Sequence, residues 1–189
     1  MNKHLLIAAV FLVLLCGTAK AESFTYAPDH CDTEVTFPEK PFIENKCLLG
    51  DNCTDVVTFT KIAPPDSSLN VRVTCVAYPK EELDTYTPEV AEETLKRLLK
   101  DQNMEAYDIS SDEQDGFRRS TSMSIGTKDN TPYMYTGQIW IGEQSMFTIE
   151  AQMKGPQNEQ IGKTFAEILK ATHAKNNKSE KEDKKTQAE

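Results

Sequence analysis

Alternation of hydrophobic and polar side chains marks the first third of the chain after residue 30. Between Leu69 and Ala77 every second residue is apolar, and Thr33 to Phe37 follows the same rule. A period of two is typical of a strand with one buried face. Turn signals such as Pro38–Pro41 and Pro64–Ser67 separate the segments, so neighbouring strands should be antiparallel. The predicted strands are 33–37, 42–47, 54–62 and 69–77.

A helix is the clearest element after these strands. Thr87 is an expected N-cap and Pro88 fits the first helical position. Acidic residues gather in the first turns and basic residues toward the end, as the helix dipole favours. The helix should stop near Asn103. Its apolar stripe is formed by Ala91, Leu95, Leu98 and Leu99.

Strand patterns return between residues 104 and 154. The strongest is a hairpin of 133–141 and 145–153, and folding it about Glu143 places Ile139 opposite Phe147. In that register one face of the hairpin is buried in the core and the other is partly exposed to solvent. The wet face would carry a small exposed apolar patch, a candidate binding surface formed by Met134, Trp140 and Met146. Shorter strands are expected at 104–109 and 117–125, with a polar acidic turn at 110–116.

A last helix should begin after Gly155-Pro156, capped by Asn158, and fade near His173. The order is strands, helix, strands, helix. It predicts an α+β fold in which a curved antiparallel sheet of about six to eight strands packs against two main helices.

The two ends of the chain differ from the middle. Residues 1–21 combine a basic start, a hydrophobic run from Leu5 to Leu15 and a final Ala-Lys-Ala, the pattern of a secretory signal peptide. Leu15, a bulky residue, argues against lipidation at Cys16. The run is shorter than the roughly 20 residues of a membrane span. We therefore expect a secreted protein, in a bacterial periplasm, with a single domain over 22–174 and a disordered charged tail over 175–189.

Four cysteines remain after the leader, and in an oxidising compartment they are expected to form disulfides: Cys31, Cys47, Cys53 and Cys75. Hairpin registers favour Cys31–Cys47 with Cys53–Cys75. The pairing Cys47–Cys53 with Cys31–Cys75 stays open, because all four lie at one end of a four-strand meander. Zinc binding is disfavoured, since the sequence between the cysteines contains no C-x-x-C.

The net charge and the absence of known catalytic motifs exclude several classes of function. The net charge of the 189 residues is −9, and without the two lysines of the leader it is −11, which disfavours nucleic-acid binding. No motif of a hydrolase, a metalloprotease or a nucleotide-binding protein occurs. We expect no cofactor, no metal site and no catalytic residue. The alternative is an enzyme that uses carboxylates such as Asp29, Asp32 or Asp112, or a metal or acid–base cluster around His30.

The order of the elements and several short segments resemble those of known proteins. The layout of strands, helix, strand meander and terminal helix resembles the PsbP-like α/β sandwich domains. The segments 35–38, 71–75, 139–142 and 149–151, together with Cys31, are similar to a group of secreted α-proteobacterial proteins of unknown function. The resemblance implies a periplasmic, non-enzymatic binding or accessory protein, whose partner is an unknown protein or small ligand. A structural component of the envelope is the other possibility that it leaves open.

Overall fold

A computed structural model describes residues 22–49, 52–114 and 116–175 of the chain. The expected leader and nearly all of the expected tail lie outside these residues. Most strands form one seven-stranded antiparallel sheet. In spatial order its strands are β3 (Phe42–Leu49), β4 (Asn52–Ala63), β5 (Ser67–Ala77), β9 (Ser145–Lys154), β8 (Thr131–Ile141), β7 (Phe117–Lys128) and β6 (Asp108–Gln114).

A second, three-stranded sheet joins both ends of the described chain. Its central strand β2 (Thr33–Phe37) pairs with β1 (Phe24–Tyr26) on one side and β10 (Thr172–Ala174) on the other. The helices are α2 (Lys80–Leu83), α3 (Pro88–Asp101) and α4 (Glu159–Lys170). The α+β class and the two main helices are therefore confirmed. The caps are confirmed too: Thr87 accepts from the Val90 N–H, and Asn158 accepts from the Ile161 N–H.

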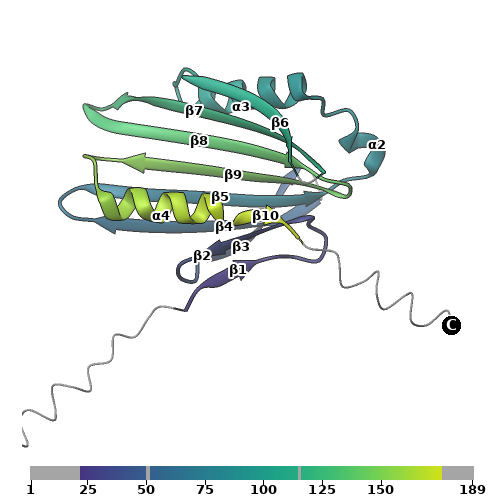
Figure 1. Cartoon of the computed structure of the whole chain (residues 1–189), viewed down its shortest axis with the longest axis horizontal. Helices are drawn as coiled ribbons and strands as arrows, with labels where there is room; N and C mark the ends of the chain where they lie inside the picture. The colour runs from purple at the N-terminus through teal and green to yellow at the C-terminus, as the bar shows by residue number, and fades with distance from the viewer. Residues whose placement is uncertain (1–21, 50–51, 115, 176–189) are drawn as a thin grey trace, which may run out of the picture.

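The two main helices lie on opposite faces of the large sheet. Helix α3 packs on β6, β7 and β8, whereas α4 packs on β4, β5 and the small sheet. Figure 1 shows α4 in front of β5 and α3 behind the strands at the opposite edge. Each helix thus covers about half of one face, and the other half of that face carries no helix.

The register of the β8–β9 hairpin explains why both faces of the large sheet are apolar and buried at these strands. Trp140 pairs with Phe147 and Ile139 pairs with Thr148, one residue away from the register centred on Glu143. The Gly142 N–H donates to the Ser145 carbonyl and closes a loop with an even number of residues. A slip of one residue exchanges the two faces of one strand relative to its partner. Consequently Ile139 faces α3 while Phe147 faces α4 and the small sheet, and both faces are buried here.

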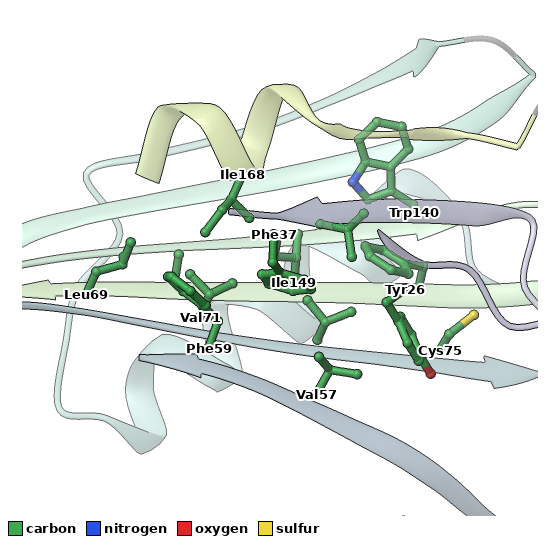
Figure 2. Packing of buried hydrophobic residues seen from close by; sticks show 14 of the residues in the cluster. Tyr26, Phe37, Val57, Phe59, Leu69, Val71, Cys75, Trp140, Ile149 and Ile168 are labelled. Carbon is green, nitrogen blue, oxygen red and sulfur yellow. The ribbon is translucent and has the colours of Figure 1, made fainter. Parts of the chain in front are cut away.

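The expectation that Trp140 is exposed is wrong. Its side chain is 3% exposed and belongs to the main core, next to Phe117 at a ring distance of 6.1 Å. Because Trp140 shares a face with Phe147, it belongs to the core cluster that also contains Tyr26 and Phe37 of the small sheet, and Figure 2 shows it near Tyr26. Met134 lies on this same face. Met146 packs on the opposite face against the α3 cluster, so the three residues form no common patch.

The position of the small sheet also determines which cysteines form disulfides with each other. The favoured pairing is wrong: the bonds are Cys31–Cys75 and Cys47–Cys53. The favoured pairing required β2 to lie beside β3, but β2 pairs with β1 and β10 instead. The segment before β2 crosses the face of the large sheet, which brings Cys31 over Cys75, whose side chain is fully buried. Cys47 and Cys53 are direct partners in the β3–β4 register and are exposed.

The expected acidic turn at 110–116 is also wrong, because most of it belongs to the edge strand β6. Its neighbour β7 carries three buried serines on the face under α3: Ser120, Ser122 and Ser124. Small residues let the helix approach closely. A Cβ at Gly137 would lie 3.2 Å from Leu95 Cδ2.

Candidate functional site

A cleft of about 1120 Å³ opens between the first turns of α4 and the neighbouring ends of β7, β8 and β9. Its apolar wall is formed by Ile125, Pro132, Met134, Met153, Pro156 and Ile161. Its size is that of the pockets in which proteins hold small ligands. The cleft is therefore the candidate functional site.

The helix arrangement creates this cleft. Helix α4 covers β4 and β5, so the ends of β7 and β8 on the same face carry no helix. Ile125 of β7 remains 59% exposed, and Met134 beside it is half-buried. Met153 of β9 continues this surface toward Ile161, which α4 holds against the main core.

Hydrogen bonds fix one wall, the segment from Gly155 to Asn158. The Gly155 N–H donates to the Pro132 carbonyl at 2.9 Å, and Ser67 Oγ donates to the Pro156 carbonyl at 2.7 Å. Asn158, besides capping α4, donates from Nδ2 to the Pro64 carbonyl at 3.2 Å. Gly155 has a φ of 103°, and a Cβ there would lie 2.1 Å from the Asp66 carbonyl oxygen. This wall is held on both sides and is preformed.

Two other glycines line the cleft without any such constraint. Gly126 lies within β7 and Gly162 within the first turns of α4. A Cβ on either would meet no atom within 4 Å, and neither has a positive φ. Glycine in the interior of a helix or strand lowers stability by roughly 0.5–1 kcal/mol relative to alanine. Neither backbone nor packing therefore requires glycine at these two positions.

Charge is distributed unevenly around the cleft. Its lining contains Lys154 and Lys163 and one acidic residue, Glu159. Lys154 makes no ion pair with any described residue, and Lys163 reaches Glu167 only at 3.9 Å. A smaller cleft of about 440 Å³, on the far side of Gly126 and Tyr133, is lined instead by Glu105 and Asp129. The larger cleft is thus locally basic in a chain whose net charge is −9.

Tyr133 separates the two clefts. Its hydroxyl donates to Gln102 Oε1 at 3.1 Å. Burial, and next the nearby charge of Glu150, raises the pKa of Tyr133 above its ordinary value. The phenol therefore stays protonated and acts as a neutral wall between the clefts.

Of the three carboxylates singled out in the sequence, Asp29 is exposed, whereas Asp32 and Asp112 have structural partners. Asp32 Oδ2 accepts hydrogen bonds from the backbone N–H groups of Gln144 and Ser145, and Asp112 forms an ion pair with Arg119. His30 Nε2 lies 3.4 Å from the Cys75 carbonyl oxygen. Within residues 22–49, 52–114 and 116–175, no three His, Cys, Asp or Glu side chains are grouped so that they could hold a metal ion.

Of the predicted patch, only Met134 lines the cleft. Sequence reasoning missed Ile125, Gly126 and Gly162. Glycine within an alternating strand and within the first turns of an amphipathic helix was the available signal, since such positions often mark a close approach to a ligand or to another backbone.

Comparison with known proteins supports the fold. No family model matches the sequence, and a search of curated proteins finds no match. The architecture is that of the PsbP-like α+β sandwich proteins. In particular, the chain is similar to the solution structure of cyanobacterial PsbP (CyanoP) from Synechocystis sp. PCC 6803. The TM-score is 0.57 and the identity 15%, over 85% of this chain and 97% of that one. This likeness establishes the fold alone.

Two further solved structures align less well. One is LpqN of Mycobacterium tuberculosis, described as involved in cell envelope biogenesis, with a TM-score of 0.41 and 12% identity over 82% of this chain and 85% of that one. The other is a protein of Bacteroides thetaiotaomicron VPI-5482, with a TM-score of 0.38 and 13% identity over 84% of this chain and 50% of that one. These two likenesses add nothing to the fold assignment. Among the described helices, none has the length and apolar character needed to cross a bilayer.

Proposed function

We propose that this protein is a non-enzymatic binding or accessory protein that acts outside the cytoplasm and holds its ligand in the cleft beside α4. The observation that carries the proposal is the preformed cleft itself. It has an apolar wall, a rim fixed by hydrogen bonds and a glycine of α4, Gly162, that leaves space inside it. Concave apolar sites with a few polar groups at the rim are the usual form of ligand sites.

Two features support an extracytoplasmic location. Both disulfides are of the kind that persists in oxidising compartments, and one of them, Cys47–Cys53, is exposed, where cytosolic reductants would reach it. The expected leader at residues 1–21 points to the same compartment. Recovery of the protein from the periplasmic fraction, with residue 22 as its N-terminus by mass spectrometry, tests this part of the proposal.

A photo-crosslinking experiment tests the site. A photoreactive amino acid replaces Ile125 in one variant and Tyr107 in another. Both side chains are exposed, but Tyr107 lies outside the cleft. We expect position 125 to capture a specific small molecule or protein and position 107 to capture nothing specific. Equal capture at both positions, or none at position 125 in cells, would contradict a function of the cleft.

A further inference from the structure

We infer that the ligand of this cleft is a fatty acid, whose alkyl chain lies along the apolar wall and whose carboxylate faces Lys154 and Lys163. The inference rests on the proposed function and specifies the chemistry of its ligand. Three independent observations carry it: the space that Gly162 leaves, the apolar character of the wall, and the positive charge of Lys154 and Lys163.

The space is the first observation. The remaining described glycines each have a positive φ or a crowded Cβ position: Gly116, Gly137, Gly142 and Gly155. Gly126 and Gly162 have neither, and both line this one cleft from different elements. Each lowers stability where alanine would be accommodated. Gly162 leaves such space in this cleft, and an occupant that fills the volume of the missing side chain explains it. Gly126 borders the cleft with its backbone, since it pairs with Tyr133 on the face of the smaller cleft.

The wall is the second observation. Met134 and Met153 are register partners on β8 and β9, and both line the cleft. Their flexible thioether side chains adapt to an unbranched chain of variable conformation. Ile125, which is 59% exposed, would be covered by an alkyl chain, at a gain of roughly 25 cal/mol per Å² of apolar surface removed from water.

The charge is the third observation, and it orients the ligand. Lys154 and Lys163 line the cleft, while the adjoining smaller cleft carries Glu105 and Asp129. An anionic head group is attracted to the first pair and repelled by the second. Since the protein is acidic overall, this local excess of positive charge selects for an anion at this end of the cleft.

Solution NMR on the protein expressed from the full sequence tests the inference. Three probes share a twelve-carbon chain and differ in head group: dodecanoate, 1-dodecanol and dodecylamine. We expect dodecanoate to shift the Gly126 and Gly162 amide resonances, which fall in the separate glycine region of the spectrum, and to leave Gly116 unchanged. The affinity should follow the order dodecanoate, dodecanol, dodecylamine.

Variants separate the head-group contact from the cleft. Lys154→Gln/Lys163→Gln should weaken dodecanoate binding roughly 2- to 30-fold, the combined range for two exposed ion pairs, without changing dodecanol binding. Lys170→Gln, an exposed lysine of α4 outside the cleft, is the matched control and should have no effect. Gly162→Phe should weaken both probes more than 10-fold. Its urea unfolding curve verifies that the variant is folded.

The outcomes distinguish this inference from the proposed function. Equal binding of the three probes, with no effect of the lysine changes, overturns the fatty acid and leaves a cleft for neutral apolar ligands. Failure of all three probes, together with specific crosslinking at position 125, overturns the fatty acid and keeps the binding function. Probe binding that persists unchanged in Gly162→Phe overturns the placement in this cleft.

Discussion

Asp32 and Ser145 hold each other in a reciprocal contact that joins the small sheet to the β8–β9 loop. The Asp32 N–H donates to Ser145 Oγ at 2.9 Å, while Asp32 Oδ2 accepts from the Ser145 N–H at 3.1 Å and from Ser145 Oγ at 3.0 Å. Gly142 leaves the space for this carboxylate, since a Cβ there would lie 2.4 Å from Oδ2. The contact spans 113 residues of sequence.

Removing this carboxylate should destabilise the fold. We expect Asp32→Ala to lower the free energy of unfolding by about 2–4 kcal/mol, because Ser145 is buried and loses hydrogen bonds to a charged acceptor. The exposed ion-pair residue Asp112 is the control, and Asp112→Ala should cost less than about 1 kcal/mol. Urea unfolding measures both. Equal losses would show that the Asp32 contact adds no more than a surface pair.

The two disulfides should contribute unequally. Cys31–Cys75 closes a loop with a sequence separation of 44, whereas that of Cys47–Cys53 is 6. Loop-closure entropy predicts losses of about 4 kcal/mol for Cys31→Ser/Cys75→Ser and about 2 kcal/mol for Cys47→Ser/Cys53→Ser.

Chemical reduction provides an independent check of this pairing. The exposed Cys47–Cys53 bond should react with dithiothreitol in the native state, while the buried Cys31–Cys75 bond stays oxidised. Peptide mapping by mass spectrometry identifies the alkylated cysteines. A peptide that links Cys31 to Cys47 would contradict the observed connectivity.

Tyr26 should make the protein sensitive to alkali. Its hydroxyl is buried and has no hydrogen-bond partner among the described residues. Burial, and next the charge of Asp55, raises the pKa of Tyr26 to about 12 from 10.0. The folded state therefore holds this proton more tightly than the unfolded state. The resulting stability is complete below pH 10.0 and is lost as the pH rises toward about 12.

Removing the hydroxyl tests this argument. At pH 7 Tyr26→Phe should leave stability unchanged or raise it by up to about 1 kcal/mol, since it removes an unpartnered buried polar group. Between pH 10 and 12 the variant should lose about 2–3 kcal/mol less than the native protein, at 1.36 kcal/mol per pKa unit. Tyr135→Phe is a useful contrast because it also removes a hydrogen bond to Glu150. Parallel stability curves for native protein and Tyr26→Phe would refute the assignment.

The glycines of the cleft should respond in opposite directions to alanine. Gly162→Ala should raise the free energy of unfolding by about 0.5–1 kcal/mol, because the helix gains propensity and the new Cβ meets open space. Gly155→Ala should lower it by more than about 1 kcal/mol, since its φ is positive and the Asp66 backbone is too close. Thermal and urea unfolding measure both. A destabilising Gly162→Ala would mean that packing requires this glycine.

Local signals in the sequence were sufficient for most elements. Thr87-Pro88 and Asn158 begin the two main helices as predicted, because capping depends on residues a few positions apart. The alternation of Leu69, Val71 and Val73 identified β5 for the same reason, since strand burial repeats every second residue. The PsbP-like α+β fold followed from the order of these elements.

Contacts between distant segments were not predictable in the same way. The burial of Trp140 depends on a hairpin register that differs by a single residue, and on a small sheet whose strands come from both ends of the chain. The pairing of Cys31 with Cys75 depends on that same sheet. The segment 110–116 is acidic and polar, yet it is a strand because β7 offers it an edge to pair with. Tertiary pairing decided all three cases against local preference.

The cleft, too, depends on contacts between distant segments and could not be predicted from the sequence. Met134 was singled out from the sequence, but for a patch around Trp140 that does not exist. Its actual neighbours, Ile125 on β7 and Gly162 on α4, become adjacent only when α4 settles on the half of the sheet formed by β4 and β5. The spacing of residues within β7 or within α4 cannot predict that these residues become neighbours.

The pairing of β2 with β10 sets a condition on how the molecule is made. Val35 aligns with Thr172 and Glu34 with His173, so the second edge of β2 is filled only after all the strands of the large sheet have been synthesised. Until then that edge of β2 has unpaired backbone groups, and a nascent chain that stalls short of β10 would leave it open to pairing with other chains. The small sheet is therefore complete only when segments from both sides of the large sheet in sequence have come together.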